Sequence, residues 1–126
     1  MKKFLWSFVL VVILISTPLV KAEAPKVISQ PTIDPLKAWI DVLETKELDK
    51  RFPRDYCRID SNGRLSCGCL QFQFRTFREQ AEKYHIDGDW KACDIQKKLA
   101  YDMLSNDLEN AWHWATSVKK IGLPKL

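Results

Sequence analysis

Four cysteines constrain this chain more than any other feature of its sequence: Cys57, Cys67, Cys69 and Cys93. The chain begins with a segment typical of exported proteins, and an even number of cysteines in such a protein favours two disulfides. A zinc site is the alternative, but Cys67 and Cys69 are separated by one residue. Structural zinc ligands are usually separated by about two to four residues. We therefore expect two disulfides, no metal and no organic cofactor.

Residues 1–22 have the features of a secretory signal peptide. Lys2 and Lys3 precede an almost wholly apolar run over residues 4–20, and small residues around Ala22 fit a cleavage site. An uncleaved membrane anchor is the alternative, although the run is slightly short for a span of about 20 residues. We expect a secreted, periplasmic or cell-envelope protein that meets a membrane only if this segment is retained.

Removing the leader also removes most of the positive charge. The whole chain has a net charge of +4, but residues 1–22 hold three of its 20 basic residues and none of its 16 acidic ones, which leaves +1. Binding to nucleic acid by counterion release requires clustered lysines and arginines. The remaining basic residues are interleaved with acidic ones, so we expect no nucleic-acid partner.

The rest of the chain predicts a small, predominantly helical α+β domain. Residues 23–33 contain two prolines and no periodicity, which is typical of a linker, so the domain would span residues 34–126. Helical apolar spacing follows in four segments, of which the first three have a capping residue, namely Asp34, Thr76 and Asp94. We expect the four helices over residues 35 to 47–50, 76–84, 94–103 and 108–120. Trp112 is expected in the core.

A β-hairpin is predicted between the first two helices. Asn62-Gly63 is a favoured two-residue turn, and it would pair Asp60 with Leu65 and Ile59 with Ser66. The hairpin would carry the first three cysteines into one small region of the fold.

The turn does not select the disulfide partners, because Cys57 would lie diagonally across from both Cys67 and Cys69. Four cysteines allow three connectivities. We favour Cys57–Cys67, with Cys69 linking the hairpin to Cys93.

Two segments together resemble a known family. Residues 36–45 form an amphipathic helix that ends in Glu44-Thr45, and residues 66–72 (Ser-Cys-Gly-Cys-Leu-Gln-Phe) form a glycine turn that leads to Gln71. The pair is similar to the lysozyme-like superfamily, especially its lytic transglycosylase (SLT) and goose-type lysozyme branch. That family has a helix ending in Glu-Ser, followed by a Gly-Leu-Met-Gln turn. The resemblance covers about residues 36–124 and implies a lysozyme-like fold.

The resemblance also implies an activity, namely cleavage of the β-1,4 bond between N-acetylmuramic acid and N-acetylglucosamine in peptidoglycan or a related N-acetylated glycan. Glu44 is the expected general acid. It flanks the apolar stripe, four residues after Ile40, near the helix C-terminus. Partial burial and the negative end of a helix both favour a protonated carboxyl. Periodicity alone does not decide between Glu44 and Glu47, which lies nearer the centre of the stripe.

A second carboxylate is needed only for hydrolysis. Asp60 in the hairpin is the best candidate, and Asp55 is the next. A lytic transglycosylase uses the substrate's own hydroxyl and gives a 1,6-anhydro sugar, but the Ala-Tyr-Asn segment common in that group is missing. The sequence therefore does not decide between hydrolysis and formation of an anhydro sugar. It also does not indicate whether the substrate is the cell's own wall or a foreign one, or what the oligomeric state is.

The resemblance assigns substrate contacts to five residues, namely Ser66, Gly68, Gln71, Tyr101 and Trp114. Glycine allows close approach of the backbone, and glutamine offers both a donor and an acceptor. The alternative function is a catalytically inactive, disulfide-stapled module that binds a glycan or a protein.

Overall fold

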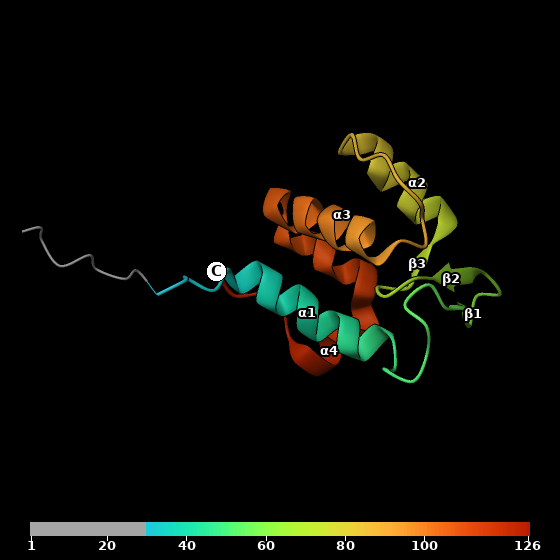
Figure 1. Ribbon diagram of the computed structural model, residues 1–126, viewed down its shortest axis with the longest axis horizontal. Coiled ribbons are helices and arrows are strands. Elements are labelled where there is room, and N and C mark those ends of the chain that lie inside the picture. Colours follow the sequence, from blue (N-terminus) through green and yellow to red (C-terminus); the bar gives the residue numbers. More distant parts are fainter. Residues whose placement is uncertain (1–29) are drawn as a thin grey trace, which may run out of the picture. The chain divides into compact units, whose positions relative to one another are not determined.

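A computed structural model describes residues 30–126, of which residues 31–126 form one compact unit (Figure 1). The predicted signal peptide at residues 1–22 and most of the predicted linker lie outside the described residues. Residues 30–33 have no regular secondary structure. None of the helices in the described part is both long enough and apolar enough to cross a membrane.

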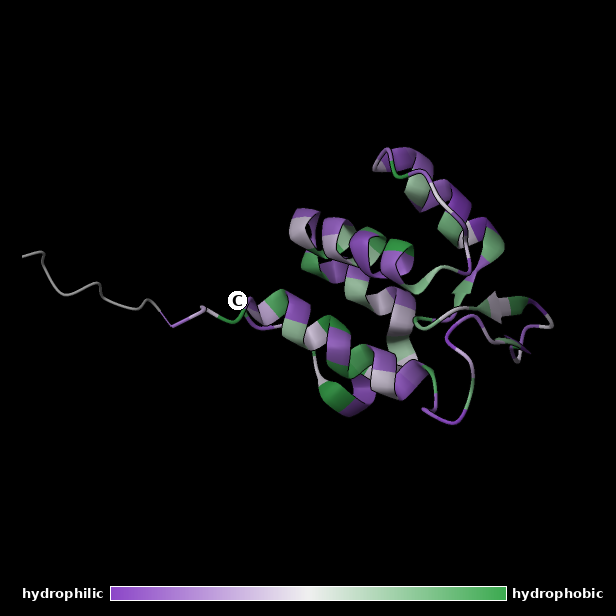
Figure 2. Cartoon of the chain, in the orientation of Figure 1, coloured by the Kyte–Doolittle hydropathy of each residue, from purple (hydrophilic) through white to green (hydrophobic). Residues whose placement is uncertain are grey.

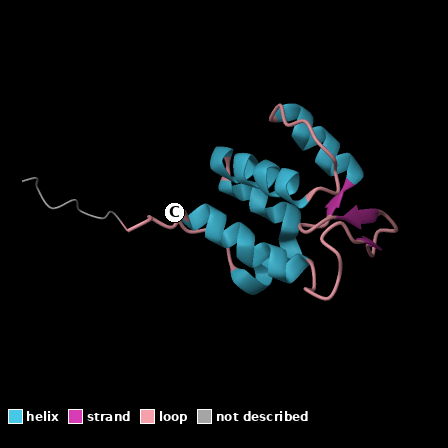
Figure 3. Ribbon diagram, viewed as in Figure 1, coloured by secondary structure: helices cyan, strands magenta, loops and turns pink. Residues whose placement is uncertain are grey.

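The described unit has an α+β fold, as predicted (Figure 3). Its elements, in chain order, are α1 (Pro35–Glu47), β1 (Cys57–Ile59), β2 (Leu65–Cys67), β3 (Phe72–Gln73), α2 (Phe74–Lys83), α3 (Cys93–Asn106), the 3₁₀ helix η1 (Leu108–Trp114) and α4 (Ala115–Ile121). The strands form one antiparallel sheet in the order β1-β2-β3.

The first helix begins and ends where the sequence predicts. The carboxylate of Asp34 accepts a hydrogen bond of 2.9 Å from the Leu36 amide, and proline occupies the first helical position. The helix buries Leu36, Ile40 and Leu43, which recur at helical spacing. Figure 2 shows hydrophobic and hydrophilic positions alternating along α1 and α3, which pack together.

Trp114 connects the C-terminal segment to the turn after β2. Trp114 is 5% exposed, its Nε1 donates a hydrogen bond of 2.9 Å to the carbonyl of Leu70, and its ring packs edge-on against Phe72. These contacts hold the beginning of α4 beside the sheet.

Three helix predictions need correction. The second helix begins at Phe74, because β3 leads directly into it through Gln73, and Thr76 is not its cap. The third helix begins at Cys93, so Asp94 lies in its first turn instead of capping it.

The predicted helix over residues 108–120 is two elements, η1 and α4, and Trp112 is 46% exposed instead of lying in the core. The 3₁₀ geometry has three residues per turn. It therefore turns Ala111 and Trp114 inward and leaves Trp112 outside.

The predicted register of the hairpin is wrong by one residue, because the loop has three residues and not two. The Asp60 amide donates to the carbonyl of Arg64 at 2.8 Å, and Gly63 has a φ of +76°. A left-handed glycine after a type I turn is typical of three-residue hairpin loops. Ile59 consequently faces Leu65 across the strands.

The favoured disulfide pairing is confirmed. Cys57 lies directly opposite Cys67 in the β1–β2 pair and is bonded to it. Cys69 is bonded to Cys93, which joins the turn after β2 to the beginning of α3.

Candidate functional site

A cleft of about 560 Å³ lies among the end of α1, the hairpin and the beginning of α4. Its wall includes Glu47, Asp60, Gln71, Trp114 and Ser117, which come from segments far apart in the sequence. The volume falls within the range of about 300–1,000 Å³ that is usual for ligand sites.

Glu47 is the last residue of α1, and its carboxyl is held at the cleft wall. The side chain is 12% exposed. Oγ of Ser117 donates a hydrogen bond of 2.5 Å to its Oε1, and the Arg58 guanidinium lies 3.6 Å from its Oε2. Burial raises the pKa of Glu47, and the Ser117 hydrogen bond and the Arg58 charge offset part of that rise. Glu47 therefore keeps its proton to a higher pH than an ordinary glutamate.

Asp60 presents a second carboxyl to the same cleft. Its Oδ2 accepts hydrogen bonds from the Ser66 hydroxyl and from Nε2 of Gln73, and its Oδ1 lies 3.8 Å from Nε of Arg58. The guanidinium of Arg58 thus contacts both Glu47 and Asp60. Ser66 is 1% exposed, so it positions Asp60 from below the cleft surface and does not line the cleft itself.

Gln71 lies in a strained part of the cleft wall, with a left-handed φ of +51°. Its Nε2 donates to the carbonyls of Tyr56 at 2.9 Å and Gly68 at 2.7 Å. These two acceptors fix the orientation of the amide, because Oε1 in that place would face two carbonyl oxygens. Oε1 is buried and has no hydrogen-bond partner among residues 30–126. Buried polar atoms without a partner are uncommon in proteins.

Gly68 has a structural role under this turn. Its φ is +85°, and a Cβ there would lie 2.2 Å from Nε2 of Gln96. Gln96 is fully buried, accepts a hydrogen bond from the Leu70 amide and donates one to the carbonyl of Cys67. The glycine therefore allows the turn to pack on Gln96, and it does not line the cleft.

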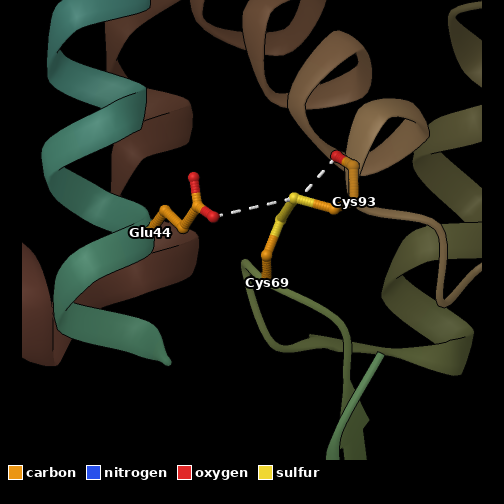
Figure 4. Close-up of side chains that lie close together, drawn as sticks. All are labelled: Glu44, Cys69 and Cys93. Atoms are coloured by element: carbon orange, nitrogen blue, oxygen red, sulfur yellow. Dashed lines mark hydrogen bonds between the residues drawn. A yellow bond between two sulfur atoms is a disulfide. The ribbon is translucent and has the colours of Figure 1, made fainter. Parts of the chain in front are cut away.

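Glu44 is not among the residues that line the cleft. Its carboxylate forms ion pairs of 2.5 Å with Arg54 and with Lys97, and its side chain is 19% exposed. It points toward the Cys69–Cys93 disulfide, where Oε1 lies 3.9 Å from Sγ of Cys93 (Figure 4). A disulfide sulfur has no proton to donate, so this is a van der Waals contact.

The same three residues do not offer a metal site. The carboxylate of Glu44 and the sulfurs of Cys69 and Cys93 lie within 4.8 Å of one another. Metal binding by cysteine requires a thiolate, and both sulfurs are in a disulfide.

The aromatic residues assigned to the substrate lie in different places. Trp114 contributes to the cleft wall, although most of its ring is in the core. The hydroxyl of Tyr101 donates a hydrogen bond of 2.7 Å to Asp34 at the beginning of α1, away from the cleft lining. Asp55, the second choice for the additional carboxylate, is exposed and does not line the cleft either.

The two residues that contact the carboxyl of Glu47 were not assigned a role from the sequence. Arg58 precedes Asp60 by two positions in the hairpin, so alternation along a strand could have indicated a shared face. Ser117 follows Trp114 by three positions, a spacing that puts both residues on one side of a helical segment. Both signals are weak without knowledge of which elements pack together.

No protein-family model, curated protein or solved structure matches this chain. The chemistry of the cleft is therefore the basis for assigning a function.

Proposed function

We propose that this protein is a secreted glycosidase of the lysozyme-like type, which cleaves the β-1,4 bond between N-acetylmuramic acid and N-acetylglucosamine with Glu47 as the general acid. One observation carries the proposal: a buried glutamic acid with a raised pKa shares a cleft with Asp60 and Gln71. Gln71 lies in the glycine turn that resembles the family, and Glu47 and Asp60 lie just outside the two segments that carry the resemblance. The two disulfides fit a protein that works in an oxidising compartment.

Glu47 takes the role that the sequence favours for Glu44. A general acid must reach the leaving-group oxygen of the substrate. Glu47 lines the cleft, whereas both carboxylate oxygens of Glu44 are engaged by cations on another side of α1.

The surroundings of Glu47 suit proton donation to a glycosidic oxygen. Burial favours the protonated acid before the reaction. After transfer, the Ser117 hydroxyl and the Arg58 guanidinium favour the carboxylate that remains. The same carboxylate could then accept a proton in the second half of the reaction.

Asp60 would stabilise the oxocarbenium-like transition state or activate a water molecule, which gives hydrolysis. Without that contribution, a hydroxyl of the substrate would attack and the product would be a 1,6-anhydro sugar. Gln71 would support glycan binding through the shape of the cleft wall, because its Nε2 holds the turn by hydrogen bonds to the carbonyls of Tyr56 and Gly68.

The test compares the oxidised wild-type protein with Glu47→Gln and with Glu44→Gln as the matched control. Each is incubated with purified peptidoglycan, and soluble products are identified by mass spectrometry. We expect Glu47→Gln to lower the cleavage rate by about 100-fold or more, and Glu44→Gln to retain it. Reducing-end products indicate a hydrolase, and anhydro products indicate a lytic transglycosylase.

If activity is lost in Glu44→Gln and kept in Glu47→Gln, the general acid is Glu44 and not Glu47. If the wild type releases no product from several wall types, the cleft is that of a binding module without catalysis.

A further inference from the structure

The cleft has more positive charge on its rim than its two carboxyls balance. Three cationic side chains line it, from Lys46, Arg58 and Lys120, against the acidic side chains of Glu47 and Asp60. Arg58 contacts both acids, so its charge is compensated locally. Lys46 and Lys120 are exposed and form no ion pair with any residue in the range 30–126.

These two lysines reach the cleft from two different helices. Lys46 directly precedes Glu47 in the last turn of α1, and Lys120 follows Ser117 by three residues in the last turn of α4. Lysines in a last helical turn also complement the helix dipole. Lys119 shares that dipole role but is not among the residues that line the cleft. A place in the last turn of a helix therefore does not by itself explain why Lys46 and Lys120 line the cleft.

We propose that this cleft selects glycans that carry carboxylate groups, which Lys46 and Lys120 bind at its rim. The inference rests on the proposed glycosidase function and adds that free carboxylate groups on the glycan, and not its sugar backbone alone, determine how tightly it binds. Residues 23–126 have a net charge of only +1. The attraction between the cleft and a carboxylate would therefore arise from this local pair of lysines and not from the net charge of the protein. A neutral glycan of the same sugar backbone would lose both contacts.

The test uses one glycan in two charge states: soluble peptidoglycan fragments with free carboxyl groups, and the same fragments after their carboxyl groups are converted to amides. Binding is measured by calorimetry with Glu47→Gln, which prevents turnover during the measurement. Initial cleavage rates are measured with the wild type. We expect the free-carboxylate fragments to bind about tenfold more tightly at low salt, and we expect that preference to shrink as salt is added.

The matched variants carry equal changes in charge. Lys46→Gln combined with Lys120→Gln should abolish the preference for the carboxylated fragments. Lys50→Gln combined with Lys119→Gln should keep it, because neither residue lines this cleft. Equal binding of both fragments to the protein with all lysines present, or an equal loss in the two double variants, would overturn the proposal.

These outcomes are separable from a failure of the proposed function. If amidated and free fragments are cleaved at the same rate, the protein is a glycosidase without selectivity for carboxylates. If the free fragments bind more tightly but no product is released, the selectivity is retained and the glycosidase activity is rejected.

Discussion

Oγ of Ser117 lies 2.5 Å from Oε1 of Glu47, which joins α4 to the end of α1 across 70 residues of sequence. Ser117 is 3% exposed, and the carboxyl of Glu47 is also largely withdrawn from solvent. A hydroxyl donor favours the ionised carboxylate, whereas burial favours the protonated one. Burial and the Ser117 hydrogen bond therefore act on the pKa of Glu47 in opposite directions, and burial has the larger effect.

Removing the donor should shift the pH profile of cleavage. In Ser117→Ala, the carboxylate of Glu47 loses its hydrogen bond, so the pKa of Glu47 should rise further. The proposed mechanism requires the protonated acid, so the decline of activity with increasing pH should occur at a higher pH than in the wild type. The measurement is kcat against pH for the wild type, Ser117→Ala and Ser117→Thr, the last of which retains a hydroxyl. An unchanged profile in Ser117→Ala would mean that the serine has only a packing role.

The raised pKa of Glu47 also predicts a pH dependence of stability. A folded-state pKa above the usual 4.5 stabilises the fold at low pH, and that contribution is lost as pH rises through the folded-state value. Glu47→Gln has no such ionisation and keeps an acceptor for Ser117. Urea unfolding should therefore show Glu47→Gln to be more stable than the wild type at about pH 7, with the difference disappearing at about pH 4. A constant difference at both pH values would contradict the burial of this carboxyl.

The predictable parts of this fold depend on local signals. Asp34 and Pro35 specify a helix start with atoms that are close in sequence, so the beginning of α1 could be predicted. The register of the hairpin could not, because Asn62-Gly63 favours a loop of two residues, whereas a left-handed glycine also ends loops of three residues. Trp112 was misassigned because the sequence does not reveal that residues 108–114 wind as a 3₁₀ helix.

The candidate site was predicted in part for a related reason. Gln71 and Asp60 both line the cleft, because the glycine turn and the hairpin bring them there locally. The choice between Glu44 and Glu47 depends on which side of α1 faces the hairpin and α4. That packing involves Ser117, which lies 70 residues away in the chain from Glu47, so the apolar stripe of one helix does not determine it.

Glu44 should contribute to stability and not to catalysis. Glu44→Gln would remove the ion-pair partner of Arg54 beside the Cys69–Cys93 disulfide, whereas Lys97 would keep its ion pair of 2.9 Å with Asp41. Arg54 is 63% exposed, so solvent screens much of its interaction, and the expected loss in unfolding free energy is about 1 kcal/mol. Urea denaturation measures the loss, and high salt should reduce the difference from wild type. A loss of several kcal/mol would mean that the cluster is more strongly coupled than its exposure indicates.

The close contact between Gly68 and Gln96 predicts a difference between two glycines with similar backbones. Gly68 and Gly63 both have left-handed φ values, of +85° and +76°. A Cβ at Gly68 would fall within 2.5 Å of three atoms of the Gln96 side chain, whereas a Cβ at Gly63 would meet nothing within 4 Å. Gly63→Ala should therefore cost about 1 kcal/mol of unfolding free energy, from the backbone alone. Gly68→Ala adds a clash with a buried, hydrogen-bonded side chain and should cost about 3 kcal/mol or more.

Urea unfolding of the two oxidised variants measures both losses, and cleavage of peptidoglycan tests their consequence for the site. Gln96 holds the turn through the Leu70 amide, and that turn leads directly into Gln71 at the cleft wall. Gly68→Ala should therefore weaken glycan binding even where the protein remains folded, and Gly63→Ala should leave binding unchanged. If the two variants lose equal stability, the side chain of Gln96 moves aside and the turn is held by the Cys69–Cys93 disulfide instead.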